Sequence, residues 1–303
     1  MNFRESLDKP LSADPLSSVR ESLIALTAHW SSGTTLAEIR SSFEKYLNEV
    51  GPRGAAMARP VAVSSLDFGA AWLGQGTRSA LYCHGGGFQI GSIASHASLI
   101  ARLAEASDTQ ILAFDYRLAP EHRYPAAVDD AFAAYQWILE YAGAPEAVIG
   151  DSAGAALAML AVQRARDAGL PLPRAIVLIS PWLDLSMQGG SYERLASSDI
   201  FSKPEQLQIM ARSYLGRQGP RADAPEVSPL WGDLSDLPPV LIHSGAADIT
   251  LDDSIALAER INALGGRAEL RIFDGMCHHF QVFEALPEAD ESVVEIGEFI
   301  RRL

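Results

Sequence analysis

The stretch EAVIGDSAGAALAML, residues 146–160, decides the fold. It begins as an apolar strand at 147–149 and continues as an alanine-rich helix. Between the two lies Gly150-Asp151-Ser152-Ala153-Gly154, a G-x-S-x-G pattern. On a sharp strand-to-helix turn this pattern presents the serine hydroxyl above a sheet, and glycines are needed because a Cβ there would collide with neighbouring backbone. The stretch therefore predicts an α/β sheet with a nucleophilic Ser152 at its edge.

From residue 58 onward, short apolar runs alternate with helical segments, which is the pattern of an α/β sheet. The later apolar runs contain almost no polar residue, as is typical of parallel strands buried on both faces. We therefore expect an eight-stranded, mostly parallel sheet flanked by helices. The expected strands are 60–64, 70–73, 79–83, 110–115, 147–149, 175–179, 240–244 and 270–273, and the expected helices between or after them are 95–107, 126–141, 153–168, 254–264 and 289–302.

Two segments fall outside this alternation. Residues 1–48 precede any strand and carry amphipathic helical patterns, whereas residues 185–225 place helix and loop between two sheet strands. In a doubly wound sheet the ligand site lies beyond the carboxyl ends of the strands. We expect the two segments to roof such a site rather than merely to pack on the sheet. Apolar candidates for the roof are Trp30, Phe43, Phe201, Met210, Tyr214 and Leu215.

A serine nucleophile in acyl transfer needs donors for the oxyanion of its intermediate. After the strand expected at 79–83 stands His84-Gly85-Gly86-Gly87-Phe88, whose three glycines leave backbone N–H groups unobstructed. An HGGG-type loop in this position supplies half of an oxyanion hole, and the helix beginning at Ala153 aims its own N–H at the same place.

The serine also needs a base, which in this arrangement follows the last strand, and an acid, which follows the strand before it. His278 and His279 both come just after the strand at 270–273, and their spacing alone does not choose between them. His243 lies inside an apolar run and is interpreted as a hydrogen-bonded core histidine. Asp248 follows the strand at 240–244, where a carboxylate can orient the imidazole and stabilise the imidazolium.

Composition excludes several functions. The formal net charge of the 303 residues is −14, from 38 acidic and 24 basic residues, which disfavours a nucleic acid or an anionic membrane as partner. Cys83 and Cys277 cannot build a disulfide framework, and no metal-type spacing is present. The N-terminal segment lacks the apolar core of a secretory signal, and no apolar run approaches a bilayer-spanning length, so we expect a cytoplasmic protein without membrane insertion.

At this point the chain resembles a known family, the hormone-sensitive-lipase-like branch of the α/β-hydrolases. The resemblance rests on HGGGF at 84–88, DYRLAPEHRYPAAVDD at 115–130, GDSAG at 150–154, SPW-L-D at 180–184, a strand ending before Asp248, and G-M-x-H at 275–278. Within that branch the chain looks most like bacterial GDSAG-type carboxylesterases, including lactone hydrolases that open monoterpene ε-lactones. Its motifs span about 200 residues in the family's order, from 84 to 278.

Carried over to this sequence, the resemblance implies Ser152 as nucleophile, Asp248 as acid and His278 as base. It implies an oxyanion hole made by the backbone of Gly85, Gly86 and Gly87 together with the Ala153 N–H. His279 is a departure, because family members often carry glycine there. The family's pattern also implies a helical cap from residues 1–50, a catalytic domain over 51–303 with a cap insertion at 185–225, and pairing into a homodimer as an option.

The function expected from these observations is a serine carboxylesterase that hydrolyses short- to medium-chain esters without a cofactor or a metal ion. A small apolar ester or lactone is the expected substrate. An ε-lactone hydrolase with the same three residues is the alternative, and a non-catalytic small-molecule receptor on the same fold, like the plant gibberellin receptor, is a more distant one. The polar run at 115–130 is interpreted as scaffold that supports the site, because its two X-Pro steps favour extended backbone.

Overall fold

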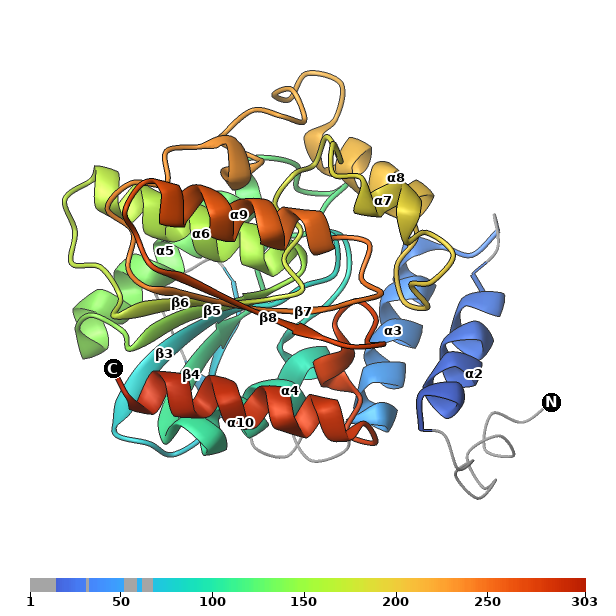
Figure 1. Cartoon of the computed structure of the whole chain (residues 1–303), viewed down its shortest axis with the longest axis horizontal. Coiled ribbons are helices and arrows are strands. Elements are labelled where there is room, and N and C mark those ends of the chain that lie inside the picture. Colours follow the sequence, from blue (N-terminus) through green and yellow to red (C-terminus); the bar gives the residue numbers. More distant parts are fainter. Residues whose placement is uncertain (1–14, 31–32, 52–58, 62–67) are drawn as a thin grey trace.

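The computed structural model describes residues 15–30, 33–51, 59–61 and 68–303. Its described residues form one sheet of eight strands in the order β1-β2-β4-β3-β5-β6-β7-β8. The strands are β1 (Arg59–Val61), β2 (Ala70–Leu73), β3 (Arg78–Cys83), β4 (Thr109–Phe114), β5 (Ala147–Asp151), β6 (Ala175–Ile179), β7 (Val240–Gly245) and β8 (Ala268–Phe273). Figure 1 shows this sheet as the middle layer of the molecule.

The sheet is parallel from β4 through β8 and antiparallel only where β1 and β2 join it. Every residue of β5 and β6 is buried, which accounts for their almost wholly apolar sequences. The outermost strand, β8, exposes alternate side chains instead. The expected mostly parallel, eight-stranded sheet is thus confirmed; of the strand expected at 60–64, residues 62–64 lie outside the described residues.

Helices cover both faces of the sheet (Figure 1). One face carries α5 (Ala126–Ala142), α6 (Ala153–Asp167) and α9 (Leu251–Ala263), and the other carries α4 (Ile93–Ser107) and α10 (Pro287–Arg301). Most residues of α6 are buried, and many are alanines whose short side chains let the helix lie close to the sheet. Two apolar cores result, one on each side of the sheet.

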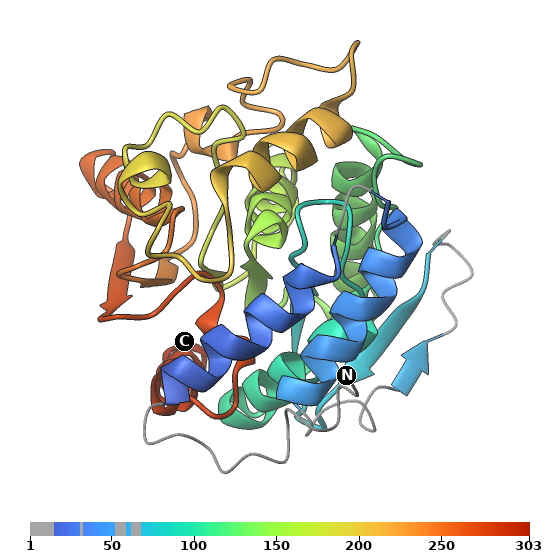
Figure 2. The ribbon, with the colours of Figure 1, turned by 90° about the vertical axis from the view of Figure 1, so that its right-hand side faces the viewer.

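Four helices lie beyond the carboxyl ends of the parallel strands. They are α2 (Pro15–Ala28) and α3 (Leu36–Val50) from the N-terminal segment, and α7 (Ser191–Arg194) and α8 (Pro204–Leu215) from the insertion. Figure 2 shows α2 and α3 side by side, with α8 above them. A capping box between Thr35 and Glu38 sets the beginning of α3. Two short 3₁₀ helices, at Pro229–Trp231 and Phe280–Val282, complete the described elements.

The polar run at 115–130 ties these layers together. Both Asp130 carboxylate oxygens accept hydrogen bonds from Arg117, whose guanidinium lies 2.6 Å from Oδ1 and whose backbone N–H lies 2.8 Å from Oδ2. Arg40 of α3 donates to the carbonyl oxygens of Gln89 and Ala119 and pairs with Glu121 at 2.8 Å. The run therefore joins the N-terminal helices to the sheet, as a scaffold would.

α5 and α6 begin at the expected residues, whereas the beginnings of α4, α9 and α10 differ from the sequence expectation by two or three residues. α4 begins at Ile93 rather than 95, because the Ser92 hydroxyl accepts the N–H of Ser95 and caps the helix earlier. α9 begins at Leu251 rather than 254. Both cysteines are free and buried. Among the described helices, none is long and apolar enough to cross a membrane.

Candidate active site

Ser152 occupies the sharp turn between β5 and α6. Its backbone has φ 50° and ψ −121°, a strained conformation that presents the side chain at the carboxyl edge of the sheet. The turn is fixed by the Ser152 N–H, which donates to the Ile179 carbonyl at 2.9 Å. A Cβ on Gly154 would lie 2.1 Å from the Cys83 carbonyl oxygen, so only glycine allows α6 to approach β3 this closely.

Ser152, His278 and Asp248 form one chain of hydrogen bonds. His278 Nε2 lies 2.9 Å from Ser152 Oγ, and His278 Nδ1 lies 2.9 Å from Asp248 Oδ1. Asp248 Oδ1 is held in place by the N–H of Thr250 at 2.8 Å and its hydroxyl at 2.9 Å. Asp248 follows β7, and His278 follows β8, so the carboxyl ends of β5, β7 and β8 bring together residues up to 126 positions apart.

The charges around His278 favour its role as a base. Burial alone would lower the pKa of the imidazole, but the charge of Asp248 and its hydrogen bond raise that pKa above the ordinary value for histidine. In the same way, burial would raise the pKa of Asp248, but His278 and the Thr250 N–H lower it. Asp248 is therefore ionised and able to stabilise an imidazolium.

The insertion contributes a second carboxylate, Asp199, which the sequence analysis did not single out. Asp199 is fully buried. One of its carboxylate oxygens lies within 4.8 Å of a carboxylate oxygen of Asp248 and of a ring nitrogen of His278. Burial and the charge of Asp248 raise the pKa of Asp199 to about 6. Asp199 lies in a loop between two short helices, where the sequence shows no motif or periodicity from which its role could have been predicted.

The HGGG loop lies beside Ser152. The Gly85 N–H donates to Asp151 Oδ1 at 2.9 Å, so this group is engaged and is not available to an oxyanion. Among the described residues, no acceptor pairs with the N–H groups of Gly86, Gly87 or Ala153. Of the four expected oxyanion donors, the N–H groups of Gly86, Gly87 and Ala153 therefore remain as candidates. Gly86 has φ 113°, and a Cβ there would lie 2.1 Å from the Ile90 carbonyl oxygen, so the loop requires glycine at this position.

A cavity of about 330 Å³ opens above the site. Ser152, His278, Gly86 and Gly87 line its floor. Its walls come from both segments expected to roof the site, and most of the wall side chains are apolar: Leu23, Leu26, Trp30, Leu36, Ile39, Phe43, Phe201, Leu207, Ile209 and Met210. The arrangement suits a small apolar ligand whose reactive atom lies above Ser152.

Four of the six apolar roof candidates, Trp30, Phe43, Phe201 and Met210, line this cavity, and two do not. Tyr214 and Leu215 are buried in the core, where the Tyr214 ring stacks on Phe88 with centroids 4.0 Å apart. Their assignment to the roof was wrong, because α8 carries a core-facing side as well as a cavity-facing side.

Three further polar residues, His243, Asp253 and His279, lie outside this chain of hydrogen bonds. His243 is buried with its Nδ1 2.9 Å from Ser292 Oγ, as expected of a core histidine. Asp253, at the start of α9, accepts the N–H groups of Leu183 and Asp184 and so supports the loop after β6. His279 adopts a left-handed backbone with φ 54°, a conformation that favours glycine over other residues.

Comparisons with known proteins agree with this geometry. A protein family described as alpha/beta hydrolase fold matches residues 80–282. An acetyl-hydrolase from Streptomyces hygroscopicus is 40% identical over 230 residues, which cover 75% of this chain and 76% of that protein. An esterase from Acinetobacter venetianus is 36% identical over 230 residues, again 75% of this chain and 76% of the relative.

Solved structures of esterases are similar to this protein over nearly its whole length. An esterase from the bacterial hormone-sensitive lipase family superposes with a TM-score of 0.88 at 34% identity, covering 96% of this chain and 99% of that one. The enzyme EstE5, in a crystal soaked with p-nitrophenyl butyrate, superposes with a TM-score of 0.85 at 36% identity and the same coverage.

Proposed function

The chain belongs to the hormone-sensitive-lipase-like carboxylesterases of the α/β-hydrolase fold, and from this premise we propose that it hydrolyses small apolar esters with Ser152, His278 and Asp248. It is a carboxylic ester hydrolase, and esterase relatives favour an enzyme over a non-catalytic receptor. The observation that carries the proposal is the continuous chain of two 2.9 Å hydrogen bonds from Ser152 through His278 to Asp248.

In the proposed acylation step, Ser152 Oγ attacks the ester carbonyl carbon while His278 Nε2 takes the hydroxyl proton. The carbonyl oxygen becomes an oxyanion, which accepts hydrogen bonds from the N–H groups of Gly86, Gly87 and Ala153. The tetrahedral intermediate then collapses, the C–O bond to the alcohol breaks, and His278 returns its proton to the departing alcohol. Asp248 stabilises the imidazolium throughout without taking the proton.

Deacylation repeats the same chemistry with water in place of serine. His278 Nε2 removes a proton from water, and the hydroxide attacks the acyl carbon bound to Ser152 Oγ. The second oxyanion occupies the same N–H groups, and the bond from the acyl carbon to Ser152 breaks as His278 protonates the serine oxygen. The carboxylic acid is released and the enzyme returns to its starting protonation state.

The cavity supports short- to medium-chain acyl groups as the substrate class. Its volume of about 330 Å³ lies at the lower end of ligand pockets, and its walls are mostly apolar. The relative from Pseudomonas putida is named ethyl acetate hydrolase, and the Streptomyces relative is named acetyl-hydrolase. An ε-lactone would undergo the same attack at its ring carbonyl, with the alcohol remaining tethered to the acyl group.

The Ser152→Ala variant tests the proposal. We expect kcat/KM for p-nitrophenyl butyrate to fall by about 10⁴-fold or more, because the covalent route is removed. An unchanged Tm and far-UV circular dichroism spectrum would show that the fold is intact. Turnover within tenfold of the wild type would overturn the proposal.

A substrate series then identifies the class. Acetyl to decanoyl p-nitrophenyl esters and a seven-membered lactone are compared by kcat/KM. We expect a maximum at the short to medium acyl chains, because the cavity is small and apolar. A higher kcat/KM for the lactone than for every linear ester would replace the ester with the lactone as the preferred substrate.

A further inference from the structure

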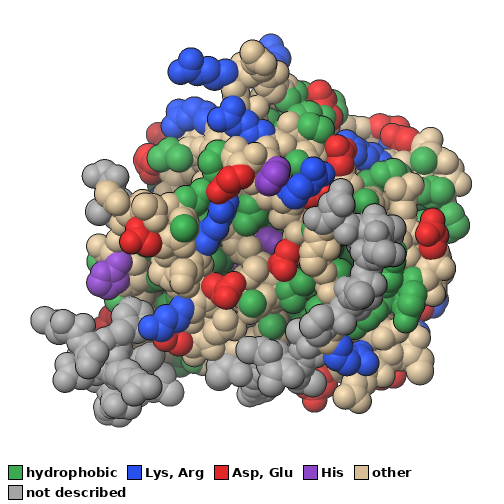
Figure 3. All heavy atoms as spheres, turned by 180° about the vertical axis from the view of Figure 1, so that it is seen from behind, with side chains coloured by type: hydrophobic (Ala, Val, Ile, Leu, Met, Phe, Trp, Pro, Cys, Tyr) green, Lys and Arg blue, Asp and Glu red, His purple; other side chains and the backbone are tan. Residues whose placement is uncertain are grey.

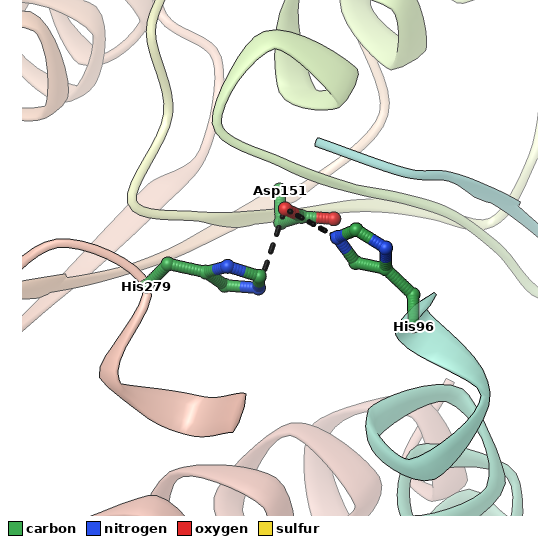
Figure 4. Close-up of side chains that lie close together, drawn as sticks. All are labelled: His96, Asp151 and His279. Carbon is green, nitrogen blue, oxygen red and sulfur yellow. Dashed lines mark ion pairs between the residues drawn. The ribbon is translucent and has the colours of Figure 1, made fainter. Parts of the chain in front are cut away.

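Three buried side chains outside the proposed catalytic residues converge on one point. They are His96 from the first turns of α4, Asp151 at the end of β5, and His279 from the loop after β8. Figure 4 shows the two imidazole rings on opposite sides of the carboxylate, each with a nitrogen turned toward it. Asp151 Oδ2 lies 3.4 Å from His96 Nε2 and 3.2 Å from His279 Nε2.

These three atoms have no hydrogen-bond partner among the described residues. His96 Nε2, Asp151 Oδ2 and His279 Nε2 are all buried, and their side chains are at most 3% exposed. A buried polar atom left without a partner costs about 1–3 kcal/mol. The three atoms face one another at ion-pair distance, and a cation held between them would give each of them a partner.

The tautomer of His96 shows which kind of atom it presents. The Ser95 hydroxyl lies 3.0 Å from the Ser92 carbonyl oxygen and 2.8 Å from His96 Nδ1, and when it donates to the carbonyl it accepts from His96 Nδ1. The Ser92 carbonyl, which only accepts, lies 3.3 Å from the same nitrogen. With the proton on Nδ1, His96 Nε2 presents a lone pair. Metal-bound histidines are held in this way, with the other ring nitrogen donating to a neighbour.

The Asp151 carboxylate is similarly fixed from behind. Its Oδ1 accepts the Tyr82 hydroxyl at 2.7 Å and the Gly85 N–H at 2.9 Å, which leaves Oδ2 free to face the two imidazoles.

We propose that His96 Nε2, Asp151 Oδ2 and His279 Nε2 bind one divalent transition-metal ion of the zinc type. Two nitrogens and one carboxylate oxygen match the ligand preference of Zn²⁺. Bond lengths of about 2.0–2.1 Å in a tetrahedral site place neighbouring ligand atoms about 3.4 Å apart. The separations of 3.4 and 3.2 Å agree with this spacing, and all three atoms lie within 4.8 Å of one another.

The cavity offers an ion a path to the site. His96 and His279 line the same cavity as Ser152, so an ion and its water can arrive from there. The neighbouring group of Asp199, Asp248 and His278 is a weaker candidate, because both ring nitrogens of His278 already make hydrogen bonds at 2.9 Å.

His279 is the ligand whose backbone conformation is unusual for its residue type. Its left-handed backbone, φ 54°, favours glycine, yet the position holds an imidazole whose Nε2 points at Asp151. The three ligands come from three separate segments of the chain, so the site could not be predicted from a short spacing between ligand residues in the sequence.

Zinc titration of chelator-treated protein tests the proposal. Isothermal titration calorimetry is run on the wild type, His279→Gly and His278→Gln, with Co²⁺ absorption spectra as a report of tetrahedral coordination. Glycine suits the backbone at 279, so this variant removes a ligand without straining the turn. We expect one equivalent of Zn²⁺ in the wild type and in His278→Gln, and an affinity at least about tenfold weaker in His279→Gly.

A second variant, His96→Gln, protects the result against a folding artefact, and Tm is measured for all proteins. It too should lose affinity at least about tenfold. The proposal is overturned if the wild type binds no stoichiometric Zn²⁺ or if His279→Gly binds as the wild type does. Loss of binding in His278→Gln with retention in His279→Gly would place the ion on the proposed catalytic residues instead. None of these readouts depends on esterase activity.

Discussion

His278 contacts Ser152 on one side and is close to two carboxylates, those of Asp248 and Asp199. Asp248 holds its Nδ1 directly, and the charge of Asp199 also raises the pKa of the ring. Asp199 itself binds backbone rather than imidazole, since its two oxygens accept the N–H groups of Phe201, Ser202 and Ile249. Asp199 is thus a positioning residue that links the insertion to the turn carrying Asp248.

Replacing Asp199 with asparagine should lower the pKa of His278, because a neighbouring negative charge is removed. A base acts only when neutral, so the acid limb of the kcat/KM profile should move to lower pH, by up to about one pH unit. The measurement is kcat/KM for p-nitrophenyl acetate from pH 5 to 9.

Asp223→Asn is the matched control, because it removes one negative charge at a half-buried position whose partner, Arg221, is exposed. Its profile should coincide with that of the wild type. An acid limb in Asp199→Asn that stays in place or moves to higher pH would contradict the assigned role. A Tm for each variant separates the charge effect from lost backbone hydrogen bonds.

At the scale of elements, α8 shapes the cavity. Met210 faces it from α8 and lies against the oxyanion loop, since its Sδ would be 2.2 Å from a Cβ on Gly87. Met210→Ala should enlarge the cavity and raise the ratio of kcat/KM for octanoyl over acetyl esters several-fold. Gln208→Ala, at an exposed position of the same helix, should leave the ratio unchanged. An unaltered ratio in Met210→Ala would show that α8 does not limit the acyl chain.

Most elements of the fold were predictable from the sequence because their patterns are local. Buried strands such as β6 are continuous apolar runs, and the G-x-S-x-G turn requires a strand before it and a helix after it. Caps were less predictable: α4 begins two residues early at its Ser92 cap. The orientation of α8 could not be predicted, because Met210 and Tyr214 are both apolar and only tertiary packing decides which faces the cavity.

The candidate site was predictable to the extent that chain order determines it. Asp248 and His278 follow the last two strands, as the order of such sites requires. The sequence reasoning did not exclude Gly85, whose N–H is taken by Asp151 across 66 residues. Contacts at such separations follow from the packing of strand ends and leave no trace in local spacing.

For the whole molecule, the charge of −14 and the buried histidines govern behaviour with pH. Figure 3 shows acidic and basic side chains interspersed with apolar ones on one face. In contrast to these surface charges, several histidines are buried and have a lowered pKa. Burial lowers the pKa of His84 and of His243 to about 3 and that of His279 to about 4.

The free energy of unfolding should therefore fall as pH decreases from about 6.5 toward 4. In this window the unfolded chain takes up protons on these histidines while the folded protein does not, so acid favours unfolding. Each such histidine contributes a slope of about 1.4 kcal/mol per pH unit. His243→Gln should reduce the slope by about that amount in urea unfolding measured at several pH values.

His29→Gln, at an exposed position, is the control and should keep the wild-type slope. A slope in His243→Gln that equals that of the wild type would contradict the assignment of His243 as a buried neutral side chain.

The central claim is that Ser152 is an activated nucleophile, and covalent labelling tests it most directly. The protein is treated with one equivalent of a fluorophosphonate, and the adduct is located by mass spectrometry of peptides. The account predicts one adduct per chain, on Ser152, with loss of esterase activity in proportion to labelling and no adduct in His278→Gln on the same timescale. Full labelling at another residue, or full esterase activity after labelling of Ser152, would contradict it.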